Sequence, residues 1–180
     1  MSLLVVARTI FTLGYDALEL EYLKSIVLSR GVEVVVDVGR WGKSIRFPRY
    51  SSTNLEREFA NIGVSYEWMP SLGGYRRFGV DVVDIGIGRC FKSEGFRAYA
   101  TYLLTSEEAR MSLERLLELG LKYKIVLLCR EKQPYRCHRK ILSDWLVYKG
   151  FRVVHLIPPK EIDHRFTKCA RVINGRLTYL

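Results

Sequence analysis

The chain has 180 residues, 48% of them hydrophobic and 27% charged, which suits one folded domain and excludes general disorder. Its longest apolar runs, such as Ile125–Cys129, are much too short to cross a bilayer, so we expect a cytoplasmic protein without a membrane partner. The net charge of the chain is +10, and most of it lies in residues 91–180, which contain 18 Lys and Arg against 9 Asp and Glu. This positive charge favours an anionic small molecule or a nucleic acid as partner. The alternative is a basic surface that is merely solvated.

Hydrophobic periodicity predicts an alternation of strands and helices along the chain. The five expected strands are residues 8–13, 32–38, 64–69, 125–129 and 152–157, and the helices between them start near residues 19, 53, 96, 106 and 138. Capping boxes at Asp16–Glu19 and Thr53–Glu56 are expected to start the first two helices, and the segment Thr105–Glu108 to cap the fourth. Residues 75–92 fit neither pattern, and a connection of this length suggests a lid, a binding loop or a hairpin insertion.

The order of these elements predicts one α/β domain over residues 1–180, with a mainly parallel sheet of about five strands and helices on both faces. Asn174-Gly175 between two alternating runs adds a C-terminal β-hairpin at about residues 168–180. Ligands of such folds bind outside the carboxyl ends of the strands. The segments expected at that edge are Gly14-Tyr15, Asp37 to Arg40, Pro70 to Gly74, and Cys129 to His138.

The densest chemistry lies in Cys129–Lys140, between the fourth strand and the helix after it. Cys129 is either an inert core thiol or a thiolate nucleophile, activated by the cations that follow it, Arg130, Lys132, Arg136 and Arg139. The order strand–Cys–loop–helix also resembles phosphatase and sulfurtransferase loops, which hold an anion at a helix N-terminus. That analogy is weakened because six residues, rather than five, separate Cys129 from Arg136, and because the loop contains no glycine.

Cys137 and His138 are adjacent in the first turn of the predicted helix, where the helix dipole favours a thiolate. They are a candidate nucleophile and acid–base pair. A metal site of Cys129, Cys137 and His138, with Cys90 as a remote fourth ligand, is the weaker option because the spacing matches no standard zinc pattern. The structural alternative is that His138 hydrogen-bonds to a neighbouring loop. Four cysteines in a chain with a large core favour a reducing compartment, hence reactive or metal-binding thiols over disulfides.

Two carboxylates and a basic loop are expected around the same crevice. Glu131 and Asp37 could each orient a histidine or an arginine or act as general base, and a structural ion pair is an equal alternative for Asp37. The loop at residues 39–52 interleaves four cations with Trp41, Phe47 and Tyr50, which suits single-stranded nucleic acid or nucleotides. His155, inside an apolar strand, and His164, in a basic tail, are expected to be structural.

Several segments together resemble the DUF488 family, a domain of unknown function common in bacteria and archaea. They are Thr12–Tyr15, Val35–Val38, the Arg/Pro-rich loop to Pro48, Leu72–Gly74 and the block Cys129-x-Glu131-x5-Cys137-His138-Arg139. The similarity covers about residues 9–157. One departure is that Gly39 separates Val38 from Arg40, where the family usually has Asp-Val-Arg. The resemblance implies a cytoplasmic α/β domain with a shared site at the strand ends, and implies neither a reaction nor a cofactor.

The sequence therefore predicts a protein that binds an anionic, phosphate-containing ligand in a crevice at the strand ends. Cys129 or the pair Cys137/His138 would carry the chemistry, with Glu131 and Asp37 as orienting groups. The residues expected to hold the ligand are Gly14, Tyr15, Arg40, Gly73, Gly74, Arg136 and Arg139. The alternatives are a non-catalytic nucleic-acid-binding module and a zinc-stabilised domain.

Overall fold

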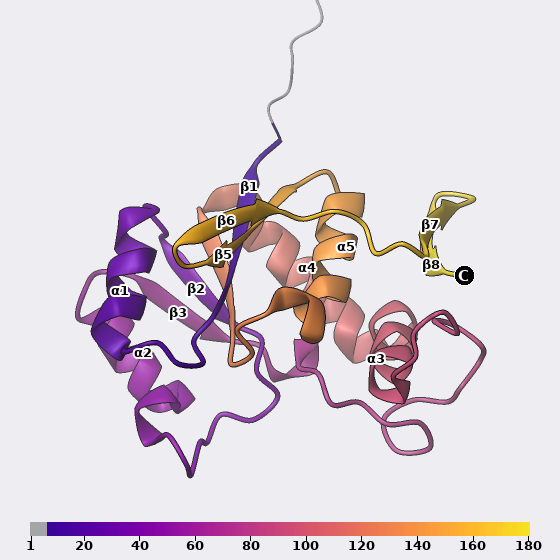
Figure 1. The fold of residues 1–180 in the computed structure, drawn as a ribbon, viewed down its shortest axis with the longest axis horizontal. Coiled ribbons are helices and arrows are strands. Elements are labelled where there is room, and N and C mark those ends of the chain that lie inside the picture. Colours follow the sequence, from indigo (N-terminus) through magenta and orange to yellow (C-terminus); the bar gives the residue numbers. More distant parts are fainter. Residues whose placement is uncertain (1–6) are drawn as a thin grey trace, which may run out of the picture.

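The fold is an α/β sandwich around a six-stranded sheet, seen in a computed structural model that describes residues 7–180 (Figure 1). The strands of this sheet are β1 (Thr9–Gly14), β2 (Val34–Asp37), β3 (Ser65–Trp68), β4 (Ile125–Cys129), β5 (Arg152–Ile157) and β6 (Lys160–Asp163). The helices are α1 (Leu20–Ser29), α2 (Ser52–Ala60), α3 (Glu94–Thr105), α4 (Glu107–Lys122) and α5 (Arg139–Tyr148). Among these residues, no helix is long and apolar enough to cross a membrane.

The sheet has the strand order β3-β2-β4-β1-β5-β6, and its first five strands are parallel. This confirms the predicted mainly parallel sheet. β6, which pairs antiparallel with β5, was not predicted. Its four residues are all exposed, so no hydrophobic alternation marks it as a strand.

Helices cover both faces of the sheet, as expected (Figure 1). α1 and α2 pack on one face through Leu23, Val27, Leu55 and Phe59, whereas α3, α4 and α5 pack on the other. β2 and β4 are buried along their whole length, which explains their continuous apolar runs. The carboxyl ends of the parallel strands are thus held on a rigid, two-sided core.

Neither of the first two predicted capping boxes forms. Glu19 is the N-cap of α1 and Ser51 the N-cap of α2, and neither side chain makes a capping hydrogen bond. Tertiary contacts override the local pattern, because the Asp16 amide donates to the Arg130 carbonyl at 2.8 Å and so belongs to the turn after β1. The third prediction is confirmed for its segment: within Thr105–Glu108, the Ser106 side chain caps α4 by accepting from the Ala109 amide at 3.4 Å.

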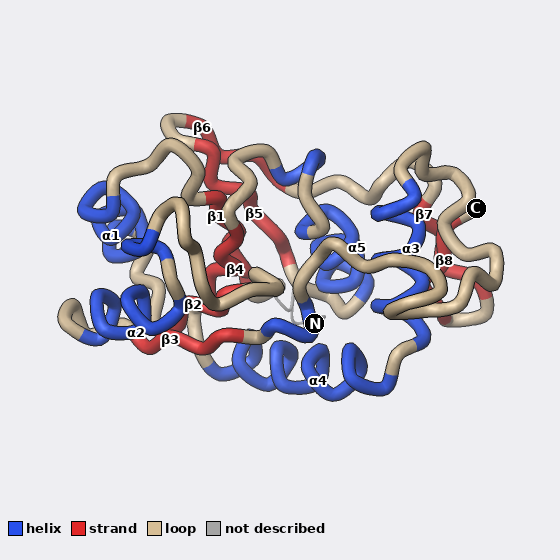
Figure 2. The backbone as a smooth tube through the Cα atoms, turned by 90° about the horizontal axis from the view of Figure 1, so that it is seen from below, coloured by secondary structure: helices blue, strands red, loops and turns tan. Residues whose placement is uncertain are grey.

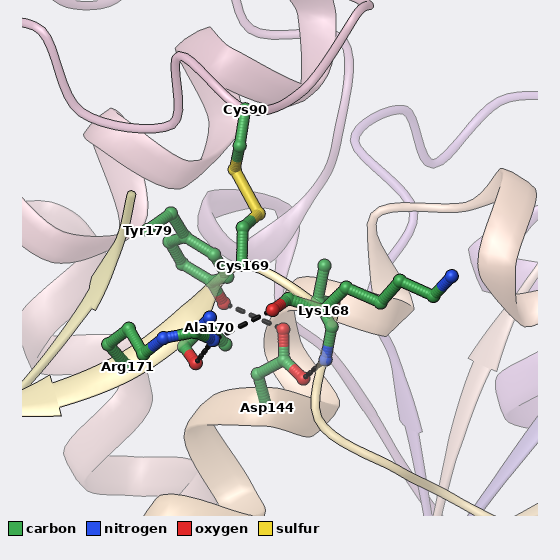
Figure 3. Close-up of a disulfide and its surroundings, with 8 residues drawn as sticks. Cys90, Asp144, Lys168, Cys169, Ala170, Arg171 and Tyr179 are labelled. Carbon is green, nitrogen blue, oxygen red and sulfur yellow. Dashed lines mark hydrogen bonds between the residues drawn. A yellow bond between two sulfur atoms is a disulfide. The ribbon is translucent and has the colours of Figure 1, made fainter.

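The C-terminal hairpin is confirmed as a separate two-stranded sheet of β7 (Ala170–Ile173) and β8 (Arg176–Tyr179). Asn174 and Gly175 both have positive φ, as the two-residue turn requires. Just before β7, Cys169 forms a disulfide with Cys90 (Figure 3). The expectation that the thiols would stay free is therefore wrong for this pair, because the fold brings their Cα atoms to 6.4 Å, within disulfide range.

Candidate functional site

A cleft of about 560 Å³ opens at the carboxyl ends of β1, β2 and β4, within the size range of small-molecule sites. Figure 2 looks onto this edge, where the loops after the strands converge. The predicted site residues that line it are Tyr15, Arg40, Gly74, Cys129, Glu131, Arg136, Cys137 and His138. The other predicted residues, Gly14, Asp37, Gly73 and Arg139, lie behind the lining rather than in it.

Two free thiols lie at the floor of the cleft. Cys129 ends the buried strand β4, and its carbonyl accepts a hydrogen bond from the Tyr15 amide at 3.0 Å. The loop after β4 then folds through a 3-10 turn at Pro134–Arg136, which returns the chain so that Cys137 Sγ lies 3.6 Å from Cys129 Sγ. Both side chains are almost fully buried, with 8% and 4% of their residue surface exposed.

His138 is held in one orientation by a backbone carbonyl. Its Nε2 lies 2.9 Å from the carbonyl oxygen of Val38, at the end of β2, and its ring packs edge-on against Tyr99 of α3. Because a carbonyl only accepts, Nε2 carries a proton. In the neutral ring, the lone pair is then on Nδ1, which lies 3.5 Å from Cys137 Sγ. His138 is therefore oriented to take the Cys137 proton.

Arg139 is a buried cation that holds the loop around the thiols. Only 1% of its surface is exposed. Its Nη2 donates to the carbonyl of Glu131, its Nη1 to Thr12 Oγ1 at 3.3 Å, and its Nε to Cys137 Sγ at 3.4 Å. Arg139 thus places a positive charge beside Cys137 from behind the cleft instead of reaching into it.

These contacts shift the pKa values of the two thiols in opposite directions. The hydrogen bond between the two thiols is the main cause that lowers the pKa of Cys137 well below its ordinary value, and the nearby His138 and Arg139 lower it further against the opposing effect of burial. The same hydrogen bond, together with burial, raises the pKa of Cys129. Cys137 is therefore the thiol of the pair that ionises more readily, and Cys129 the one that keeps its proton.

The predicted glycines act by allowing close packing. A Cβ at Gly14 would collide with the carbonyl of Glu131, and a Cβ at Gly73 would lie 2.5 Å from Arg40 Cα. At Gly74 it would lie 2.8 Å from His138 Nδ1, the atom that faces Cys137. Each glycine therefore lets one wall of the site approach another.

Asp37 lies under the turn that presents the Val38 carbonyl. Its carboxylate accepts from the Gly39 amide at 2.8 Å and from the Tyr66 hydroxyl at 2.6 Å. Burial is the largest effect on this carboxyl and raises the pKa of Asp37, although both hydrogen bonds oppose that shift. Asp37 is thus bonded to the turn whose Val38 carbonyl meets His138, and its side chain makes no hydrogen bond to His138 itself.

The loop at residues 75–92 lines part of the cleft and holds Arg40 in place. Sequence reasoning did not single out the two residues of this loop that make the contacts, Arg76 and Asp81. Asp81 pairs with Arg40, and Arg76 donates through Nε to the Gly73 carbonyl at 3.0 Å and lies over the ring of Tyr102. No local pattern marks these residues, because Asp81 meets Arg40 at a separation of 41 residues and Arg76 meets Tyr102 on α3. This loop fixes Arg40 at the cleft, and its Tyr75 is one of the lining residues.

The mouth of the cleft is basic and aromatic. Its exposed cations Lys43 and Arg136 make no ion pair within residues 7–180, whereas Arg130 lies 3.8 Å from Asp16. Glu131 is exposed, and its carboxylate accepts from the Gln133 amide at 3.4 Å. The aromatic side chains that line the cleft are Tyr15, Trp41, Tyr50, Tyr75, Phe96 and Tyr99.

Three metal-ligating atoms gather at the floor. One atom each of Cys129, Cys137 and His138 lie within 4.8 Å of one another. The expected remote fourth ligand is wrong, because Cys90 is bonded to Cys169. The described residues therefore bring together three donors at this place, one fewer than a closed structural zinc site uses.

A family model described as "Domain of unknown function DUF488" matches residues 20–146, a span that includes both free thiols, His138 and Arg139. No curated protein and no solved structure matches the chain. The match ends within α5 and leaves out β5, β6 and the C-terminal hairpin.

Proposed function

The chain belongs to the DUF488 family, whose function is unknown, and we propose from its site that Cys137 is a nucleophile acting on an anionic, phosphate-containing ligand in the cleft. The observation that carries this proposal is the pairing of Cys137 Sγ with His138 Nδ1 at 3.5 Å, while Val38 fixes the opposite ring nitrogen. A nucleophile beside an oriented base is the arrangement that thiol catalysis requires.

The covalent step uses residues already in contact. The Cys137 proton passes to His138 Nδ1, and Sγ forms a bond to the electrophilic atom of the ligand as the bond to the leaving group breaks. Protonated His138 returns the proton to that leaving group. Water, or a second nucleophile activated by His138, then releases the thiol.

The cleft supplies the binding side of the proposal. Lys43 and Arg136 are exposed cations at its mouth, and Arg40 is held near them by Asp81. The exposed Trp41 offers an aromatic face on which a planar ring could stack, and the mutually stacked rings of Tyr15 and Tyr50 line the same cleft. Phosphate contacts from cations combined with ring stacking favour a nucleotide-like ligand over a simple inorganic anion.

The proposal is tested by comparing two alkylating reagents that differ in charge. Iodoacetate is anionic and iodoacetamide neutral, and an ordinary thiolate in water prefers the neutral reagent. In a cationic cleft we expect iodoacetate to modify Cys137 faster than iodoacetamide by roughly tenfold, since local charge raises encounter rates. Peptide-level mass spectrometry measures both rates, and inorganic phosphate should protect Cys137.

Matched variants separate the cleft from general charge. Arg136→Ala should slow iodoacetate while sparing iodoacetamide, and Lys122→Ala, at the opposite edge of the sheet, should change neither rate. If the wild type reacts faster with iodoacetamide, or if phosphate does not protect Cys137, the proposal that the cleft binds anions is overturned. Equal reactivity of Cys137 and Cys129 would contradict the assignment of Cys137 as the nucleophile.

A non-catalytic nucleic-acid-binding module is the second candidate, favoured by the exposed loop beside the cleft. Trp41 is 64% and Ile45 96% exposed, and Arg46 and Arg49 lie in the same loop. This function predicts binding to single-stranded DNA or RNA that weakens steeply with salt and is indifferent to Cys129→Ser. Salt-independent binding, or none, would remove it.

A zinc-stabilised domain is supported less well. Three donors and an open face toward the cleft do not make the closed four-ligand site that stabilises small domains. Elemental analysis of protein purified without chelators decides the matter. One tightly bound zinc per chain would contradict the free-thiolate proposal.

A further inference from the structure

A second cluster of buried polar groups lies behind Arg139, on the side away from the cleft. It runs from Thr12 Oγ1 to His155 Nδ1 at 2.7 Å, from His155 Nε2 to His164 Nδ1 at 2.9 Å, and from His164 Nε2 to Asp144 Oδ1 at 2.8 Å. The β1–β5 register builds its first link, since it places Thr12 directly beside His155. None of these side chains lines the cleft.

One direction of hydrogen bonding satisfies every group of this chain. A guanidinium only donates and a carboxylate only accepts, so Arg139 and Asp144 are the two ends. In that direction each of the three groups between them donates once and accepts once. Arg139 donates to Thr12, Thr12 to His155, His155 to His164 and His164 to Asp144. This direction requires both imidazoles to be neutral, with the proton on Nε2.

Burial supports the neutral state of the central ring. His155 is 5% exposed, and desolvation, followed by the nearby His164 and Arg139, lowers the pKa of His155 to about 3. Asp144 is fully buried and also accepts from the Thr167 amide and the Tyr179 hydroxyl, each at 2.9 Å. The Asp144 end of this chain of hydrogen bonds is thus covered by the C-terminal segment, residues 164–180.

We propose that Asp144, His164, His155 and Thr12 form a relay that positions Arg139 against Cys137, so that the C-terminal segment, outside the family match, completes the reactive site. The inference rests on the proposed role of Cys137. Thr12 holds Nη1 of Arg139 while the Glu131 carbonyl holds Nη2, which leaves Nε facing Cys137 Sγ. His164 and Asp144 are positioning residues, because they act on Cys137 through Arg139.

The C-terminal segment is fastened next to the relay by a covalent bond. Figure 3 shows Tyr179 hydrogen-bonded to Asp144, with the Cys90–Cys169 disulfide close by. The disulfide and Tyr179 anchor the segment without being members of the relay. They offer controls that loosen the segment but keep the relay intact.

The test measures iodoacetamide alkylation of Cys137 at about pH 7 in full-length variants. His164→Phe keeps an aromatic ring but breaks the relay, and we expect the rate to fall about five- to tenfold as the thiolate is lost. Asp144→Asn keeps the shape at the end of the relay and should give a smaller fall. Tyr179→Phe and Val153→Ala, a buried neighbour on β5, should leave the rate near that of the wild type.

Charged and titratable groups face Cys137 from four elements: Cys129 from β4, Tyr99 from α3, His155 from β5, and His138, Arg139 and Lys140 at the start of α5. All six remain in every variant, so a change in the alkylation rate reports the relay. A wild-type Cys137 that is fast and is unaffected by His164→Phe and Asp144→Asn would overturn the relay alone. A slow wild-type Cys137 would instead overturn the proposed function.

Nitrogen-15 NMR of the histidine side chains tests the relay independently of reactivity. We expect His155 and His164 in the wild type to be neutral with the proton on Nε2. A charged ring, or a proton on Nδ1 in either residue, would overturn the proposed direction whatever the thiol rates are.

Discussion

Two buried polar clusters flank Arg139, and they differ in how completely their hydrogen-bonding groups are used. In the relay, Thr12, His155 and His164 each have a donor on one side and an acceptor on the other. In the cleft cluster, His138 has one nitrogen bonded to Val38 and the other facing a thiol that borders open space. A buried cluster whose hydrogen bonds are all made stabilises the fold, whereas a cluster with a group facing a cavity is available for chemistry.

The same residue type therefore takes different roles in the two clusters. The pKa of His155 is lowered to about 3, so this ring stays neutral in the physiological range, whereas Nδ1 of His138 faces the Cys137 thiol. The difference comes from which groups meet the second ring nitrogen. Substitutions that change these groups should therefore alter stability and thiol reactivity to different extents.

Arg139→Met removes the cation that the two clusters share. We expect the unfolding free energy to fall by about 3–5 kcal/mol, because buried acceptors and the Cys137 thiolate lose their partner. Chemical denaturation measures the loss. Arg110→Met, which breaks exposed pairs with Glu107 and Glu114, should cost less than about 1 kcal/mol. Equal costs for the two variants would contradict a central role for Arg139.

Acidification should destabilise the relay through His155. Its folded pKa of about 3 lies below the ordinary value near 6.5, so its contribution is complete above pH 6.5 and is lost as pH falls toward 3. The loss over that window is on the order of 4 kcal/mol. We expect the stability advantage of the wild type over His155→Gln to shrink by this amount, measured by denaturation at each pH. Parallel curves for the two proteins would show that His155 does not titrate as inferred.

The paired substitution Cys90→Ser/Cys169→Ser tests the anchor of the relay. Removing a cross-link over 79 residues should lower stability by about 2–4 kcal/mol, because the unfolded chain gains freedom. The alkylation rate of Cys137 should stay near that of the wild type, since no hydrogen bond of the relay is removed. A large drop in that rate would mean that the disulfide itself holds the site.

Gly74→Ala affects the cleft cluster alone. The new methyl group would lie 2.8 Å from His138 Nδ1 and push the imidazole away from Cys137, at a cost of about 1–3 kcal/mol and with slower alkylation. Gly95→Ala is the control within α3, where a Cβ meets only Ser93 Oγ at 3.6 Å, so stability should be retained or rise. Thermal unfolding and labelling compare them. Retained reactivity in Gly74→Ala would show that His138 is not needed at its present place.

The sequence predicts the sheet, the two helical layers and the edge where the thiols meet, because long apolar runs and glycine stops report local structure. It does not predict β6, whose side chains are all exposed, or the disulfide, whose cysteines are 79 residues apart. The motif around Cys129 and His138 locates the cleft cluster. The relay escapes prediction, because Thr12, Asp144, His155 and His164 share no motif and meet only through the β1–β5 register and the packing of the C-terminal segment.

The pH profile of Cys137 alkylation by iodoacetamide tests directly whether Cys137 is the reactive thiolate. Mass spectrometry of the peptide that contains Cys137 measures the rate at each pH. The pKa of Cys137 is lowered, so its rate should reach half its maximum well below about pH 8.5, the ordinary value for a cysteine, while Cys129 stays unreactive. A midpoint at or above that value, or faster labelling of Cys129, would contradict the assignment of Cys137 as the reactive thiolate.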